Sequence, residues 1–193
     1  MTIEFNSRGN DFDQRTIIAL VEDKPGVLAR IASLFRRRGF NIASLAVGRS
    51  EKSGLSRMTF VVEGDEWVVE QVTKQLFKLI DVVRVSDISE DSIVVRELAL
   101  VKVKSSNETR PEIMQIVDIF RSNIVDVGEG SLIVEVTGDE EKIDALVRLL
   151  QPFGIQETMR TGRIAITRGA AATGATEVVA LGEHSAPDTE VVP

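Results

Sequence analysis

The order of apolar and polar residues predicts a first unit of six elements. An apolar run of strand length covers Arg15–Glu22, and after a break at Asp23–Gly26 apolar residues recur with helical spacing up to Phe35. Gly39 then has the position of a glycine that ends a helix. Two strand patterns, a helical stripe that Asp65 is placed to cap and a further strand pattern follow, at 42–49, 56–63, 65–80 and 82–88. The order β-α-β-β-α-β predicts a ferredoxin-like fold.

The same order of elements returns after the polar linker Ser89–Ser92. Strand patterns and helical stripes alternate again, at 97–104, 113–120, 124–127, 132–137, 143–150, 155–161 and 163–167. Thr109 and Glu112 are spaced as a capping box before the first helix of this unit, and Pro111 falls in its first turn. The repeat predicts an α+β protein built of two ferredoxin-like βαββαβ lobes.

The predicted lobes cover residues 15–90 and 94–168. Residues 169–193 are rich in alanine, glycine, threonine and acidic residues and have no periodicity, which predicts a disordered tail. The polar segment Met1–Gln14 is expected to be frayed.

The bend between the first strand and the first helix is a candidate binding site. A helix N-terminus leaves the backbone N–H groups of Val27 and Leu28 without partners inside the helix, and its dipole favours an anion by about 0.3–1 kcal/mol. Gly26 has no Cβ, so a ligand can approach the backbone closely. A small carboxylate fits this position, although most Pro-Gly bends are strand-to-helix turns without a ligand. The second unit lacks a glycine at the equivalent place, 107–111, so any ligand is assigned to the first lobe.

Composition and charge narrow the class of protein. The 193 residues are 43% hydrophobic and 27% charged, as in a globular protein. The net charge of −7 argues against a nucleic-acid partner. No apolar run approaches the roughly 20 residues of a membrane span, and the N-terminus has no signal-peptide pattern. The absence of cysteine fits the cytoplasm.

The residue types needed for most catalysis are missing. The chain has no cysteine and no tyrosine, and its one histidine, His184, lies in the predicted tail. These absences exclude a folded His/Cys metal site and a Ser-His or Cys-His nucleophile pair. Neither a phosphate-binding P-loop nor a dinucleotide-binding glycine fingerprint occurs. The sequence therefore predicts a binding protein without catalytic residues, metal or cofactor.

Longer stretches resemble a known family. Asp23–Leu28, at a strand–helix junction, is similar to the ACT domain, a regulatory module that binds small molecules. Leu28–Ile42, Ser44-Leu45 and Leu55–Thr59 resemble the small regulatory subunit of acetolactate synthase (acetohydroxyacid synthase). Later segments fit the same family, at 74–85, 96–102, 119–121 and 131–138. The likeness covers about residues 15–168.

The resemblance implies a regulatory subunit without catalysis of its own. Members of this family bind the large catalytic subunit, which carries thiamine diphosphate, magnesium and FAD. They raise its activity and confer feedback inhibition by valine on branched-chain amino acid synthesis. The resemblance also implies a homodimer in which ACT sheets pair edge to edge, with effector sites at the interface.

The same resemblance implies an effector site made of residues from two segments. The first segment supplies Asp23, Gly26, Val27 and Leu28, and the second supplies Asn41 and Ile42, from the same or the neighbouring subunit. The chemistry fits a free amino acid, because N–H groups can bind its carboxylate while the oxygens of Asp23 and Asn41 can accept from its ammonium. Val27, Leu28 and Ile42 offer apolar surface to a small branched side chain.

Two points in the sequence stay open. Some family members have a neutral Asn at the position where this chain has Asp23. The contact with the ammonium is therefore charged in this chain but not in those members, which leaves its strength open. A stand-alone ACT-type amino-acid sensor, acting on another enzyme or on transcription, is the alternative to the regulatory subunit.

Overall fold

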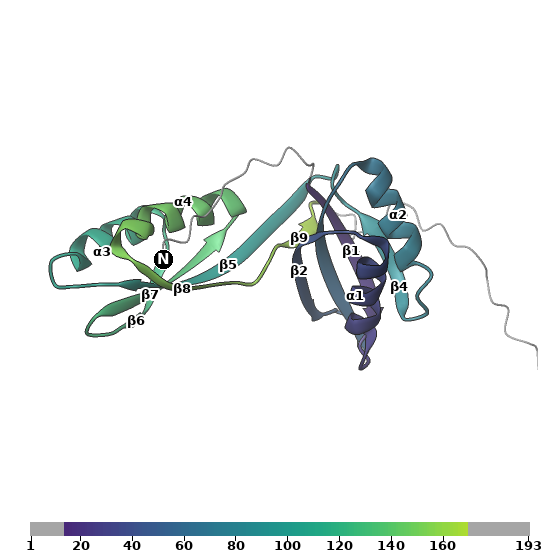
Figure 1. The fold of residues 1–193 in the computed structure, drawn as a ribbon, viewed down its shortest axis with the longest axis horizontal. Coiled ribbons are helices and arrows are strands. Elements are labelled where there is room, and N and C mark those ends of the chain that lie inside the picture. The colour runs from purple at the N-terminus through teal and green to yellow at the C-terminus, as the bar shows by residue number, and fades with distance from the viewer. Residues whose placement is uncertain (1–13, 170–193) are drawn as a thin grey trace, which may run out of the picture.

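The computed structural model describes residues 14–169, which form two lobes connected by one long strand and by the segment 161–163 (Figure 1). Our predictions for the N-terminal segment, for the tail after Gly169 and for His184 lie outside these residues. None of the helices within 14–169 has the length and apolar character that a membrane crossing requires.

The first lobe has the predicted β-α-β-β-α-β order and forms a four-stranded antiparallel sheet. Its strand order is β2-β3-β1-β4, so β2 and β4 are the edges. Both helices cover one face of this sheet (Figure 1). The elements are β1 (Gln14–Glu22), α1 (Val27–Arg38), β2 (Ile42–Arg49), β3 (Leu55–Glu63), α2 (Glu66–Leu76) and β4 (Val82–Asp87).

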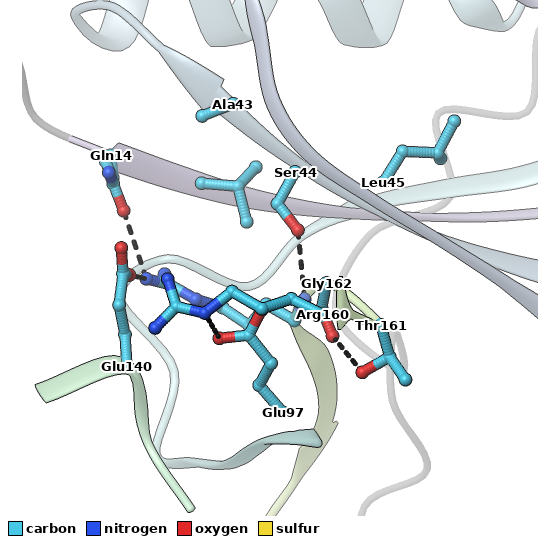
Figure 2. Close-up of a pocket in the computed structure, with 11 residues that line it drawn as sticks. Gln14, Ala43, Ser44, Leu45, Glu97, Glu140, Arg160, Thr161 and Gly162 are labelled. Atoms are coloured by element: carbon cyan, nitrogen blue, oxygen red, sulfur yellow. Dashed lines mark hydrogen bonds and ion pairs between the residues drawn. The ribbon is translucent and has the colours of Figure 1, made fainter. Parts of the chain in front are cut away.

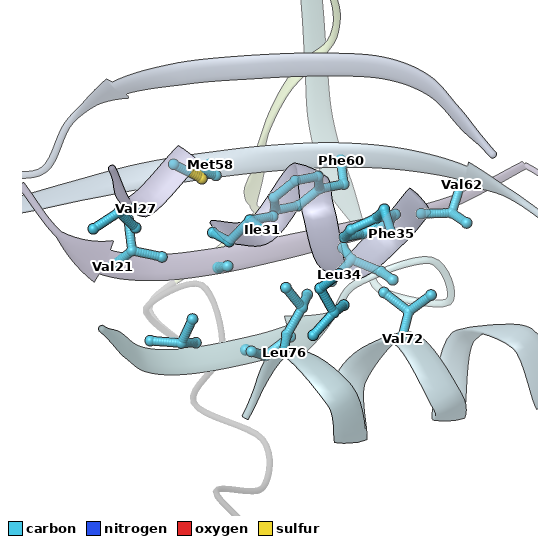
Figure 3. Close-up of a cluster of buried hydrophobic side chains, with 14 of the residues drawn as sticks. Val21, Val27, Ile31, Leu34, Phe35, Met58, Phe60, Val62, Val72 and Leu76 are labelled. Atoms are coloured by element: carbon cyan, nitrogen blue, oxygen red, sulfur yellow. The ribbon is translucent and has the colours of Figure 1, made fainter. Parts of the chain in front are cut away.

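The core of the first lobe lies between the helices and the sheet (Figure 3). Phe35 of α1 stacks on Phe60 of β3 with ring centroids 5.4 Å apart, and both rings are almost fully buried. Burial of such a side chain contributes about 1.5–3 kcal/mol. The sequence places Ile80 on the buried stripe of α2, but the helix ends at Leu76 and Ile80 is 94% exposed on the following turn.

The second lobe repeats the architecture and confirms the predicted fold class. Its main sheet has the order β6-β7-β5-β8, covered by α3 and α4. The elements are β5 (Ile93–Lys104), α3 (Arg110–Ile119), β6 (Asn123–Val127), β7 (Ser131–Gly138), α4 (Glu140–Leu150), a 3-10 turn (Gln151–Phe153) and β8 (Ile155–Arg160). The predicted capping box is wrong, because the hydroxyl of Thr109 accepts from the N–H of Ser106 and makes no cap bond to α3.

The last strand, β9 (Ile164–Thr167), does not join β8 beside the second lobe's helices. It pairs with the first four residues of β5, from Ile93 to Arg96, and forms a two-stranded ribbon. Ala165 of this ribbon packs with Ile18 and Ile88 of the first lobe, on the sheet face opposite α1 and α2 (Figure 1). The sequence pattern identifies this strand correctly but assigns it to the second lobe alone.

Candidate functional site

The bend after β1 is open to solvent and held by backbone hydrogen bonds. The N–H of Asp23 donates to the carbonyl of Gly54 over 2.8 Å, and that of Lys24 donates to Glu22 over 3.0 Å. Gly26 caps α1 with φ 87° and ψ −10°, in the left-handed region that favours glycine. A Cβ built at Gly26 would meet nothing within 4 Å. The bend therefore leaves room for a ligand directly above the helix N-terminus.

Backbone donors at this N-terminus differ partly from the prediction. The N–H of Val27 is not free, because it donates to the carbonyl of Lys24 over a long 3.4 Å. The N–H groups of Leu28 and Ala29 have no acceptor among residues 14–169, while that of Arg30 already donates to Gly26. An anion at the bend would thus bind Leu28 and Ala29. Ala29 is not among the predicted site residues, although the rule that leaves the first N–H groups of a helix without partners includes it.

The apolar side chains predicted at the site have unequal access. Val27 is 3% exposed and packs in the first lobe's core, so its side chain cannot contact a ligand. Leu28 is 46% exposed at the bend. Ile42 is half-buried at the start of β2 and packs against the same core. Of the three, Leu28 offers the most free apolar surface.

The polar side chains of the site retain free acceptors. The carboxylate of Asp23 is exposed and has no hydrogen bond or ion pair within the described chain. The amide Nδ2 of Asn41 donates to Glu63 Oε2 over 2.7 Å, and Asn41 Oδ1 accepts no hydrogen bond from the part of the chain that the structure describes. Both side chains can therefore accept from an ammonium group.

The structure separates the two halves of the predicted site within one subunit. Asp23–Leu28 precede α1, whereas Asn41 and Ile42 follow it. The 12 residues of α1 span about 18 Å at 1.5 Å per residue. A free amino acid is far shorter than this helix, so one chain cannot place both halves on one ligand. The same-subunit alternative is thus excluded.

The register of the sheet shows where the halves lie. Glu22, just before the bend, pairs with Leu55, and Arg49 at the end of β2 pairs with the adjacent Ser56. The bend and the end of β2 therefore share one end of the sheet. Ile42 pairs with Val62 at the opposite end.

Two observations concern the ionisable side chains elsewhere in residues 14–169. No group of three His, Cys, Asp or Glu residues within 14–169 is arranged to hold a metal ion. A backbone hydrogen bond at Glu51, with further bonds from Arg57 and Ser50, lowers the pKa of Glu51 from 4.5 to about 2. This carboxylate is fully exposed in the β2–β3 turn and has an arginine partner, as in an ordinary surface ion pair.

A cleft of about 320 Å³ separates the two lobes (Figure 2). Its walls come from β1, β2 and β3 of the first lobe and from β5, α4 and the segment 160–163 of the second. The cleft does not include the bend at Asp23–Leu28. It is therefore a feature of the lobe junction and not of the candidate effector site.

Two family models match most of the chain. The small subunit of acetolactate synthase matches residues 96–169, and the AHAS small subunit-like ACT domain matches residues 17–84. The chain belongs to the acetolactate synthase small-subunit family. This confirms the family that the sequence resembles, and the first lobe is an ACT domain.

Individual relatives agree with this assignment. A probable acetolactate synthase small subunit from Archaeoglobus fulgidus is 58% identical over 156 residues, or 81% of this chain and 98% of the relative. The acetolactate synthase small subunit of Mycolicibacterium smegmatis is 50% identical over 166 residues, or 86% and 98%. The solved structure of the small subunit from Thermotoga maritima is 42% identical and superposes with a TM-score of 0.77, covering 82% of this chain and 99% of that one.

Proposed function

We propose that this protein is the regulatory subunit of acetolactate synthase, which activates the catalytic subunit and makes it sensitive to valine. It binds the large subunit in the cytoplasm, and thiamine diphosphate, magnesium and FAD belong to that partner. The observation that supports a sensory role is the exposed glycine bend, in which two N–H groups have no acceptor among residues 14–169, in a lobe that matches the ACT family.

The carboxylate of valine binds at the N-terminus of α1. The N–H groups of Leu28 and Ala29 are its donors, and the helix dipole adds about 0.3–1 kcal/mol. Gly26 admits the ligand because a side chain at this position would project into the open space above the bend.

The ammonium of valine binds to carboxylate and amide oxygens. Asp23 supplies a charged acceptor from the same subunit as the bend. Asn41 of a second subunit supplies Oδ1, with its Nδ2 held by Glu63 so that the amide orientation is fixed. The charged contact at Asp23 strengthens the hydrogen bond relative to a neutral amide.

A homodimer brings these halves together through the edge strand β2. When two antiparallel copies of β2 pair, the start of one strand lies beside the end of the other. Asn41 and Ile42 of one subunit then lie at the sheet end that holds Arg49 and the bend of its neighbour. Such pairing also removes the exposed edge of β2.

Apolar surface at this end fits a small branched side chain. Leu28 and Val47 are both about half exposed in the single chain, at 46% and 49%. Discrimination by one methylene is worth only about 1–3 kcal/mol, so leucine and isoleucine are expected to bind more weakly than valine but still measurably.

Activation is tested by mixing purified subunits. The protein alone is expected to have no synthase activity, and titrating it into the catalytic subunit is expected to raise activity to a plateau. Added valine should then lower this plateau while leaving the catalytic subunit alone unaffected. No stimulation by a protein that melts cooperatively would instead favour a stand-alone sensor, which should also fail to co-purify with the catalytic subunit.

The shared site is tested by mixing two variants that each bind valine more weakly than the parent. Gly26→Asp damages the bend, and Asn41→Ala damages the opposite half, so each homodimer has two defective sites. In a mixed dimer one site contains both changes and the other contains neither. Calorimetry should therefore find about one intact site for each mixed dimer. Absence of valine binding in the mixture, with exchange of subunits demonstrated, would rule out a site built from two chains.

A further inference from the structure

We propose that Ser44 transmits effector occupancy from the ACT lobe to the second lobe through its contact with Gly162 and Arg163. The proposal rests on the proposed function, because it concerns how valine at the first lobe acts elsewhere. Ser44 is not part of the effector site, but it lies in β2 two residues after Ile42.

An irregularity in β2 lies between the effector site and Ser44. Ile42 pairs with Val62, but Ser44 already pairs with Val61, so Ala43 is an extra residue in the ladder. Such a bulge bends the strand and re-aims the residues that follow it. A ligand that contacts Asn41 and Ile42 can therefore shift Ser44 without breaking the rest of β2.

Ser44 meets the segment that returns from the second lobe (Figure 2). The N–H of Arg163 donates to Ser44 Oγ over 2.9 Å. Gly162 comes so close that a Cβ would lie 2.7 Å from Ser44 Oγ and 3.2 Å from the carbonyl of Leu45. Gly162 also has φ 81°, which disfavours any other residue. The close approach of the two backbones depends on this glycine.

The side chain of Arg163 bonds to residues of both lobes. Its guanidinium Nη2 donates to Gln14 Oε1 of β1 over 3.0 Å and to Glu140 at the start of α4. Glu140 directly follows Asp139, the N-cap of α4. A displacement of Ser44 thus reaches a helix of the second lobe through one residue.

The cleft around this contact leaves the lobes room to move. It is lined by polar as well as apolar residues, and its volume of about 320 Å³ is not filled by packed side chains (Figure 2). Because the lobes do not pack tightly here, their relative placement depends on a few specific contacts. Energetic coupling between two distant sites requires a structural element whose arrangement both sites can change, and the placement of the lobes is such an element here.

The test separates valine binding from the response to it. Ser44→Ala removes the acceptor for Arg163 and leaves every proposed effector contact intact. We expect calorimetry to give a valine dissociation constant within threefold of the parent and stimulation of the catalytic subunit to remain unchanged. Activity at saturating valine should rise at least threefold above that of the parent complex.

Thr161→Ala is the matched control. Thr161 lies in the same returning segment, but its hydroxyl exchanges hydrogen bonds with Leu98 and the backbone of Gly162 and none with the first lobe. Inhibition by valine should match the parent in this variant. Equal inhibition in Ser44→Ala and the parent, or loss of valine binding in Ser44→Ala, would overturn the proposal.

Hydrogen exchange gives a readout that does not involve the catalytic subunit. Valine should change the exchange rate of the Arg163 amide at least threefold in the parent and leave it unchanged in Ser44→Ala. Gly162→Ala, which forces the segments apart, should have the same uncoupled behaviour. A parent protein that binds no valine would contradict the proposed function, whereas a parent that binds valine without any change at Arg163 would contradict the coupling alone.

Discussion

Replacing Gly26 with aspartate puts a negative charge where the carboxylate of the effector is expected. The new side chain has room, because a Cβ at Gly26 meets no atom within 4 Å. The backbone conformation, φ 87°, costs an ordinary L-residue about 1–2 kcal/mol, and aspartate and asparagine tolerate it better than most. A loss of about 1 kcal/mol lowers the melting temperature of a lobe of this size by about 4–8 °C. The variant should therefore fold.

The expected effect on binding follows from Coulomb's law. Two like charges 4 Å apart repel by about 1 kcal/mol in water and about 4 kcal/mol at an effective dielectric constant of 20. The bend is exposed, so the lower part of this range applies, at about 1–2 kcal/mol. Valine affinity should fall about five- to thirtyfold, since 1.4 kcal/mol corresponds to about a factor of ten.

Gly26→Asn is the matched control, because it has nearly the same shape and backbone preference without the charge. Calorimetry with valine on both variants, with thermal melts alongside, separates charge from bulk. The aspartate variant should bind at least fivefold more weakly than the asparagine variant, while both still stimulate the catalytic subunit. Equal affinities in the two folded variants would show that no carboxylate lies near Gly26.

Three further predictions concern stability and ionisation. Phe60→Ala empties a fully buried position stacked on Phe35 and should cost about 3–5 kcal/mol in denaturant unfolding; a cost below 1 kcal/mol would contradict the packing. Asp65 and Asp139 each cap a helix through a backbone N–H, so alanine at either should cost about 0.5–2 kcal/mol in thermal unfolding, and no loss at both would refute the caps. Because the pKa of Glu51 is lowered to about 2 in the folded protein, its stabilising effect is present above pH 4.5 and lost as the pH falls towards 2. NMR titration should find this pKa, and a value near 4.5 would contradict the hydrogen bonds at the turn.

Local sequence patterns predicted the ends of helices well where a single residue determines the backbone conformation or caps the helix. Gly39 ends α1 with φ 72°, and the side chain of Asp65 accepts from the N–H of Val68, both as the sequence indicates. Thr109 failed as a cap because Ser106 forms a local turn that uses the same hydroxyl. Such side-chain turns compete with helix caps and are not visible in the spacing of residues.

The sequence predicted the backbone features of the candidate site, but not which of its groups a ligand can reach. Glycine at the bend and free donors in the first turn follow from the sequence, whereas the bond from Val27 to Lys24 depends on how tightly the bend closes. The burial of Val27 and the separation of Asn41 from the bend needed the three-dimensional structure. Periodicity identified β9 as a strand, but pairing with the distant Ile93–Arg96 is a tertiary choice that no local pattern encodes.

The ribbon of β5 and β9 also has a consequence for the order in which the chain folds. During synthesis on the ribosome the ACT lobe emerges first, but Ala165, which covers Ile18 and Ile88, is made only near the end of the described chain. Until then Ile18 and Ile88, which are almost fully buried in the finished protein, lack the part of their cover that Ala165 adds to Ile93 and Val95. The first lobe to be synthesised is therefore the last to be completed. A nascent chain released before Ala165 would expose apolar surface that favours binding to chaperones and aggregation with other nascent chains.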